Sequence, residues 1–174
     1  QWYKKYCESI VKELCTKYGK LFLVWFDGGA DDPNGLGPDV EPIIKEYQPN
    51  CLFYHNVNRA DIRWGGSESG SVPYPCWSTF PTCFSHGNQT ESVKDYQNIL
   101  SHGTPDGKYW MPAMADFPLR GYHHRHEWFW EPEDDDAVFP VKDLLTKYEE
   151  SVGRNATMVI GLTPDTAGLI PECD

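Results

Sequence analysis

The stretch Lys20-Leu21-Phe22-Leu23-Val24-Trp25-Phe26-Asp27-Gly28-Gly29 decides the fold expected for this chain. Its apolar residues run without interruption to Phe26, which is typical of a strand buried on both faces of a parallel sheet. The run ends in the carboxylate of Asp27, and the two glycines after it allow the chain to turn sharply away. An acid at the carboxyl end of such a strand is where a (β/α)8 barrel keeps its chemistry. A turn that merely opens with an Asp-Gly pair is the alternative.

Helical and extended patterns alternate around this strand. A helix is expected over residues 1–18, where apolar residues recur at helical spacing before Gly19. The alternation predicts an α/β fold with parallel strands. Four such units are half of a TIM-type (β/α)8 barrel, so residues 1–174 are expected to be about half of one barrel domain, with the remaining strands outside this chain. The other expected helices cover 39–47, 91–101 and 141–152, and the other strands cover 51–55, 109–116 and 157–162.

Composition narrows the class of partner. The 174 residues are 40% hydrophobic, which is enough for a sizeable core, and the formal net charge is -11. This sign of charge argues against a nucleic-acid or anionic membrane surface, because both attract basic patches. The 7 Trp and 10 Tyr favour a carbohydrate partner, since sugars bind to flat aromatic faces. No run of 18 apolar residues occurs, so no membrane-spanning helix is predicted.

The chain end and the cysteines add three expectations. Because the chain starts at Gln1 inside an expected helix, we expect the true N-terminus and any targeting signal to lie upstream. Cys51 opens an apolar run and is expected to be a buried free thiol. Cys76 and Cys83 flank a short loop and are candidates for a disulfide, which the spacing leaves open.

A long region without a regular pattern, from residue 56 to about 90, is predicted to be functional loop. It carries Glu68 between glycines. Hydrolysis of a glycosidic bond needs two carboxyl groups across that bond. Asp27 suits the nucleophile because it is short and fixed at a strand end, and Glu68 suits the acid because its longer side chain reaches the leaving oxygen. A solvated loop glutamate is the alternative in a chain with 26 acids.

A histidine-rich segment raises the question of a metal. His123, His124 and His126 precede Glu127, but the spacing is not the His-Glu-x-x-His of a zinc site. A polar loop that lines a pocket is the favoured interpretation. The sequence therefore predicts no metal and no organic cofactor.

Four segments resemble the α-L-fucosidases of glycoside hydrolase family 29, from the middle of their catalytic barrel onward. Residues 18–28 resemble the strand-four segment, whose Asp is the nucleophile. The segment Asp61-Ile62-Arg63-Trp64-Gly65-Gly66-Ser67-Glu68-Ser69-Gly70 resembles Asp-Ile-Arg-Trp-Val-Gly-Asn-Glu-x-Gly of the branch that prefers α-1,3/1,4 linkages, in which the Glu is the acid/base. Residues 110–116 resemble Trp-x-Pro-Ala-Glu-x-Asp, and residues 151–170 resemble the last barrel segment.

The resemblance implies a retaining exo-glycosidase that removes terminal α-L-fucosyl residues from oligosaccharides or glycoconjugates by double displacement. Asp27 would be the nucleophile and Glu68 the acid/base, with no cofactor and with the remaining half of the barrel required for activity. An extracellular, periplasmic or lysosomal location follows from the same resemblance. Substrate contacts are expected from Trp25, His55, Arg63, Trp64, Trp77, Asp116, His126 and Trp128.

Three departures from the family pattern bear on the substrate. Met114 stands where the family has Glu, and Gly65 and Ser67 replace Val and Asn beside Glu68. Two alternatives therefore remain open. One is a related glycosidase that acts on another sugar, such as an α-L-galactoside, and the other is a carbohydrate-binding homologue without activity.

Overall fold

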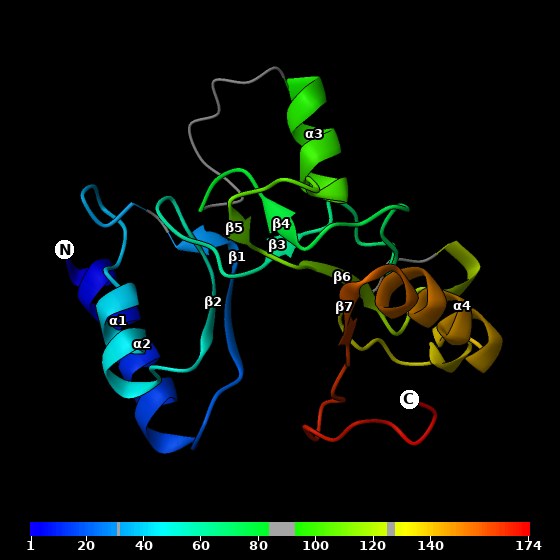
Figure 1. Ribbon diagram of the computed structural model, residues 1–174. Helices are drawn as coiled ribbons and strands as arrows, with labels where there is room; N and C mark the ends of the chain where they lie inside the picture. The colour runs from blue at the N-terminus through cyan, green and yellow to red at the C-terminus, as the bar shows by residue number, and fades with distance from the viewer. Residues whose placement is uncertain (31, 84–92, 125–127) are drawn as a thin grey trace.

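The computed structural model describes residues 1–30, 32–83, 93–124 and 128–174. Helices and strands alternate along much of the chain, as the sequence predicts, and Figure 1 shows their arrangement. The α-helices are α1 (Trp2–Lys17), α2 (Glu41–Tyr47), α3 (Val93–His102) and α4 (Val141–Ser151), and the short 3-10 turns are η1 (Tyr122–His124), η2 (Asp135–Ala137) and η3 (Val152–Arg154). The strands are β1 (Leu23–Ala30), β2 (Leu52–Asn56), β3 (Arg63–Trp64), β4 (Thr79–Phe80), β5 (Tyr109–Trp110), β6 (Ala113–Pro118) and β7 (Ala156–Gly161).

The first unit consists of two parallel strands and two helices. β1 pairs with β2 in the register Leu23 to Leu52 through Trp25 to Tyr54. Figure 1 shows α1 and α2 side by side next to this pair. Buried side chains from both helices and from β2 form one apolar cluster, because the helical periodicity in each segment turns its apolar stripe toward the strands. The cluster includes Val11, Cys15, Ile44, Cys51 and Phe53.

The second unit is a three-stranded parallel sheet in the order β3-β6-β7. β6 is its central strand, and all six of its residues are buried. The register between β6 and β7 is continuous from Ala113 opposite Ala156 to Pro118 opposite Gly161. α4 lies beside β7 in Figure 1. A strand with no exposed face is expected in a parallel sheet that is covered on both sides.

The four expected strands correspond to β1, β2, β6 and β7, which pair in parallel within their sheets, but the structure adds short strands that were not expected. β4 and β5 form an antiparallel pair, with Thr79 opposite Trp110. The region predicted to be irregular contains β3 and β4, which are only two residues long. The expected strand over 109–116 divides into β5 and β6 around Pro112, which lacks an amide hydrogen. Among the described residues the strands thus form separate small sheets, and two-residue strands are too short to show an alternating pattern.

The cysteines are all free. The thiol of Cys51 is buried, as predicted. Cys76 is not bonded to Cys83. The Cys76 sulfur accepts a hydrogen bond from Arg63 at 3.2 Å, and the Cys83 thiol donates to the Asn58 carbonyl at 3.6 Å. The candidate disulfide is therefore absent from the structure. No helix within the described ranges has the length and apolar character needed to cross a membrane.

Candidate active site

Asp27 lies where the pairing of β1 with β2 is interrupted. The register is regular up to Trp25 and resumes only at Ala30. Gly28 and Gly29 lie between these points with φ angles of +72° and +89°, a region that favours glycine. This local break leaves the Asp27 side chain exposed beside the sheet and not paired within it. The Asp-Gly-Gly sequence thus corresponds to an interruption of the strand pairing.

A hollow of about 190 Å³ lies at this break. A larger hollow of about 570 Å³ shares four residues with it, Trp25, Asp27, Glu68 and Asp116. The two therefore form one site with a narrow and a wide part, which we call the acidic pocket. Carboxylates beside aromatic faces suit a polyhydroxylated ligand, because hydroxyl groups donate to the carboxylates and C–H faces pack on the rings. The narrow part adds Gly28, Tyr54 and Trp64, and the wide part adds Trp128 and Phe129.

Glu68 reaches the acidic pocket from a loop that is fastened at several points. The amide of Gly65 donates to the Met114 carbonyl at 2.9 Å, and the amide of Gly70 donates to the Asp116 carbonyl at 3.0 Å. Further along, the amide of Val72 bonds to the Glu150 carbonyl. The loop is therefore tied to β6 and α4 although its Glu68 side chain is exposed.

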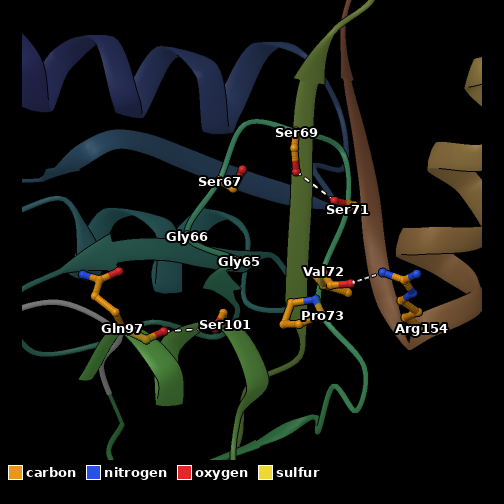
Figure 2. Close-up of a pocket in the computed structure, with 10 residues that line it drawn as sticks. All are labelled: Gly65, Gly66, Ser67, Ser69, Ser71, Val72, Pro73, Gln97, Ser101 and Arg154. Atoms are coloured by element: carbon orange, nitrogen blue, oxygen red, sulfur yellow. Dashed lines mark hydrogen bonds between the residues drawn. The ribbon is translucent and has the colours of Figure 1, made fainter. Parts of the chain in front are cut away.

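A second, polar hollow of about 470 Å³ lies against the same loop. Figure 2 shows the loop between Gln97 and Ser101 of α3 on one side and Arg154 on the other. The Arg154 guanidinium donates to the Val72 carbonyl at 2.8 Å, and the hydroxyl groups of Ser69 and Ser71 lie 2.9 Å apart. Its lining includes neither Asp27 nor Glu68.

Asp116 is the buried acid of the pocket, with 4% of its surface exposed. Its Oδ1 accepts a hydrogen bond from the indole Nε1 of Trp64 at 2.6 Å. Burial raises the pKa of Asp116, the Trp64 bond opposes this, and the negative charges of Glu68 and Asp27 raise the pKa further. The three carboxyl groups line the same pocket, so the charges of Asp27 and Glu68 act on the buried carboxyl of Asp116.

Three of the predicted contact residues lie outside the acidic pocket. The Arg63 guanidinium is fully buried and donates to the carbonyls of Leu100 and Met111 at 2.8 and 2.6 Å. Arg63 therefore holds α3 and the β5–β6 connection together, and its side chain lies away from the acidic pocket in which a substrate contact was expected. Trp77 is half-exposed and does not line the pocket. His55 is buried behind Gly29, where a Cβ would lie 2.7 Å from the imidazole ring.

The remaining predicted residues divide into two groups. Trp25, Trp64, Asp116 and Trp128 line the acidic pocket together with Asp27 and Glu68. His126 lies outside the described residues, as does Glu127 of the histidine-rich segment. In the described part of the chain, no three His, Cys, Asp or Glu side chains gather into a possible metal site.

Two aromatic lining residues were missed in the sequence. Tyr54 meets Trp25 edge to face with ring centroids 5.8 Å apart. Its position in an apolar strand gave no signal, because a buried tyrosine there has the pattern of a core residue. Phe129 is 82% exposed and stands next to Trp128, so the aromatic run itself was a signal for it.

The sequence and the structure of this chain were compared with those of known proteins. No protein-family model matches the chain. The chain is 31% identical to α-L-fucosidase 1 of Arabidopsis thaliana over 179 residues, which cover 99% of this chain and 32% of that protein. A crystal structure of a provisionally named α-L-fucosidase from Bacteroides thetaiotaomicron matches with 63% identity and a TM-score of 0.94, over 99% of this chain and 39% of that one. These matches support a relationship of this chain to the α-L-fucosidase family.

A third similar protein is described as a member of glycoside hydrolase family 29. A glycoside hydrolase 29 family member from an unknown rumen bacterium matches with 28% identity and a TM-score of 0.77, over 98% of this chain and 31% of that one. The chain thus spans about a third of the length of these three relatives. All three relatives carry the names of glycoside hydrolases. Most of the length of each lies outside the part that this chain matches.

Proposed function

We propose that this chain is the part of a retaining α-L-fucosidase that carries the nucleophile and the acid/base. Within such an enzyme it would form the second half of a (β/α)8 barrel, from strand four onward. One observation carries the proposal: Asp27 and Glu68 line the same pocket, next to the buried carboxyl of Asp116. The pocket that they line is open, which supports an enzyme over a binding protein without activity, for which a blocked cleft would be expected.

The proposed reaction is a double displacement. The Asp27 carboxylate attacks the anomeric carbon, and Glu68 gives its proton to the leaving oxygen as the glycosidic bond breaks. Glu68 then takes a proton from water, which attacks the same carbon and releases Asp27 from the covalent intermediate. A separation of about 5–5.5 Å between the two carboxyl groups is the geometry that this route requires.

The substrate proposed is a terminal α-L-fucosyl residue on an oligosaccharide or glycoconjugate, with the α-1,3/1,4 linkages of the branch that the Glu68 segment resembles. Trp25, Trp64 and Trp128 would supply aromatic faces for the sugar, and Asp116 an acceptor for a hydroxyl group. An extracellular, periplasmic or lysosomal location remains part of the proposal and depends on the resemblance alone.

A second candidate is a related glycosidase that acts on another sugar, such as an α-L-galactoside. Met114 favours it. The residue is completely buried in an apolar cluster with Tyr54 and Leu100, so it offers the pocket no polar contact where the family has a carboxyl group. A sugar that makes a different set of hydroxyl contacts would then be accommodated.

We also propose that activity requires the remaining half of the barrel. Apolar side chains are exposed just before β1 and after β7, and a partner segment would bury them. In such a completed barrel the open edges of the small sheets would also be paired. The exposed residues include Phe22, Leu162, Leu169 and Ile170.

The test is hydrolysis of an aryl α-L-fucoside by the enzyme completed with its N-terminal half, followed by NMR of the first sugar released. Retention predicts that the α-anomer appears first. Initial release of the β-anomer would exclude the double displacement. Turnover of an aryl α-L-galactoside in preference to the fucoside would select the second candidate, and turnover by the isolated 174 residues would contradict the need for the other half.

A further inference from the structure

Lys147 of α4 makes a direct contact with the loop that carries Glu68. Its Nζ donates a hydrogen bond of 2.6 Å to the carbonyl oxygen of Ser69, the residue that follows Glu68. The two partners are separated by 78 positions in the chain. A contact between a helix and the backbone next to the proposed acid is placed to influence where that acid points.

The peptide unit between Ser69 and Gly70 is held at both ends. Lys147 binds its carbonyl oxygen, and its N–H donates to the Asp116 carbonyl at 3.0 Å. Because a peptide unit is planar, two opposed hydrogen bonds fix its orientation. Gly70 adopts a φ of +73°, and a Cβ at this position would lie 2.5 Å from the Phe117 ring. The backbone directly after Glu68 therefore has little room to rotate.

The ammonium group of Lys147 is itself held in place by two aromatic rings. Nζ lies 4.7 Å from the ring centroid of Phe117 and 4.5 Å from that of Phe139. Contacts of a cation with two ring faces restrict a long side chain that would otherwise be mobile. Burial lowers the pKa of Lys147, while the charges of Glu150 and Asp143 act in the opposite direction. Lys147 is thus a half-buried donor held beside two rings, although its bond to Ser69 lies at the surface.

We propose that Lys147 is a positioning residue that orients the general acid Glu68 through the Ser69 carbonyl. The inference rests on the proposed function of Glu68 and assigns no contact with the substrate to Lys147. Without the Lys147 bond the Ser69–Gly70 peptide keeps only its tie to Asp116 and can tilt. The Glu68 carboxyl then approaches the leaving oxygen less often, whereas attack by Asp27 is unchanged.

The experiment compares Lys147→Met with Lys142→Met in the completed enzyme. Methionine keeps an apolar chain between the rings and removes the donor, and Lys142 is an exposed lysine of the same helix. Aryl fucosides with good and poor leaving groups are assayed side by side, together with thermal unfolding. We expect Lys147→Met to lower kcat/KM for poor leaving groups about 10–100-fold, part of the usual effect of acid catalysis, and to leave good leaving groups within about threefold. Lys142→Met should resemble the wild type on both.

Glu68→Ala separates the two possible failures. Combined with Lys147→Met it should show no further loss for poor leaving groups, because the acid to be oriented is gone. A selective loss in Glu68→Ala with equal losses, or none, in Lys147→Met overturns the positioning role and leaves the proposed function intact. A non-selective loss in Glu68→Ala overturns the proposed function itself. If Lys147→Met does not fold, Lys147→Arg is assayed with the same good and poor leaving groups. It keeps the charge and shifts the donor, so the same selective loss is expected.

Discussion

The indole N–H of Trp64 donates a hydrogen bond to the carboxylate of Asp116 at 2.6 Å, from one parallel strand to its neighbour. The register places Trp64 opposite Met114, and Asp116 follows two positions later on the same face. The bond fixes the direction of Asp116, which is buried, whereas the other described acids of the acidic pocket, Asp27 and Glu68, are exposed. The carboxyl that the substrate would meet is therefore oriented before any ligand binds.

Asp116→Asn should change how stability depends on pH. Burial raises the pKa of Asp116 in the folded state, so the protonated form favours folding. This contribution is fully present below the unfolded pKa of about 3.9 and is lost as the pH rises through the raised folded pKa. Asparagine keeps an acceptor for Trp64 and carries no charge. Relative to the wild type, the variant should gain in Tm as the pH is raised from 4 to 7, in thermal unfolding of the completed enzyme.

The control for this change is Asp106→Asn, at an exposed aspartate away from the pocket. It should follow the wild-type dependence of Tm on pH. Parallel curves for the wild type and Asp116→Asn would show that the buried carboxyl does not destabilise the fold when ionised.

Asp27→Ala should abolish the first chemical step. Removal of a nucleophile typically costs about 10⁴-fold or more in turnover. The small space left by the side chain admits azide, which should attack the anomeric carbon and give a glycosyl azide of inverted configuration. Turnover of an aryl fucoside is measured with and without azide. A variant that retains near wild-type turnover would exclude Asp27 as the nucleophile.

Glu68→Ala should be selective for the leaving group. Good leaving groups depart without a proton, so the first step survives with them, whereas sugars and other poor leaving groups should lose about 10²–10⁴-fold. Equal damage to both substrate classes would make Glu68 a structural residue, and the acid would then be sought among Asp116, Glu127 and Glu131.

Gly70→Ala should disturb the loop without touching a catalytic group. A Cβ would lie 2.5 Å from Phe117, and the φ of +73° is unfavourable for alanine. A strained residue of this kind costs on the order of 1–3 kcal/mol in the free energy of unfolding. Gly153→Ala is the matched control, because nothing lies within 4 Å of its added Cβ. Denaturant unfolding measures both variants, and equal stabilities would show that the loop adapts around Phe117.

Local sequence patterns predicted the helices well. The apolar spacing in residues 1–18 and 141–152 corresponds to α1 and α4, because a helix buries one stripe whose period is written in its own residues. The run up to Phe26 corresponds to β1, and the Asp-Gly-Gly sequence marks the break that exposes Asp27. These features depend on residues that are neighbours in the chain, so the sequence by itself determines them.

The tertiary structure decided which of these elements share a pocket. Tyr54 and Trp64 line it, whereas Arg63, one position before Trp64, points into the core and binds the carbonyls of Leu100 and Met111. The antiparallel β4–β5 pair and the bond from Lys147 to Ser69 also join segments that lie tens of residues apart. Local periodicity indicates whether a residue is buried but not which residue it contacts, because that contact is set by packing between elements. The sequence thus determined the strand that leads to Asp27 and the glycine-flanked loop of Glu68, and only folding brought Asp27, Glu68 and Asp116 together.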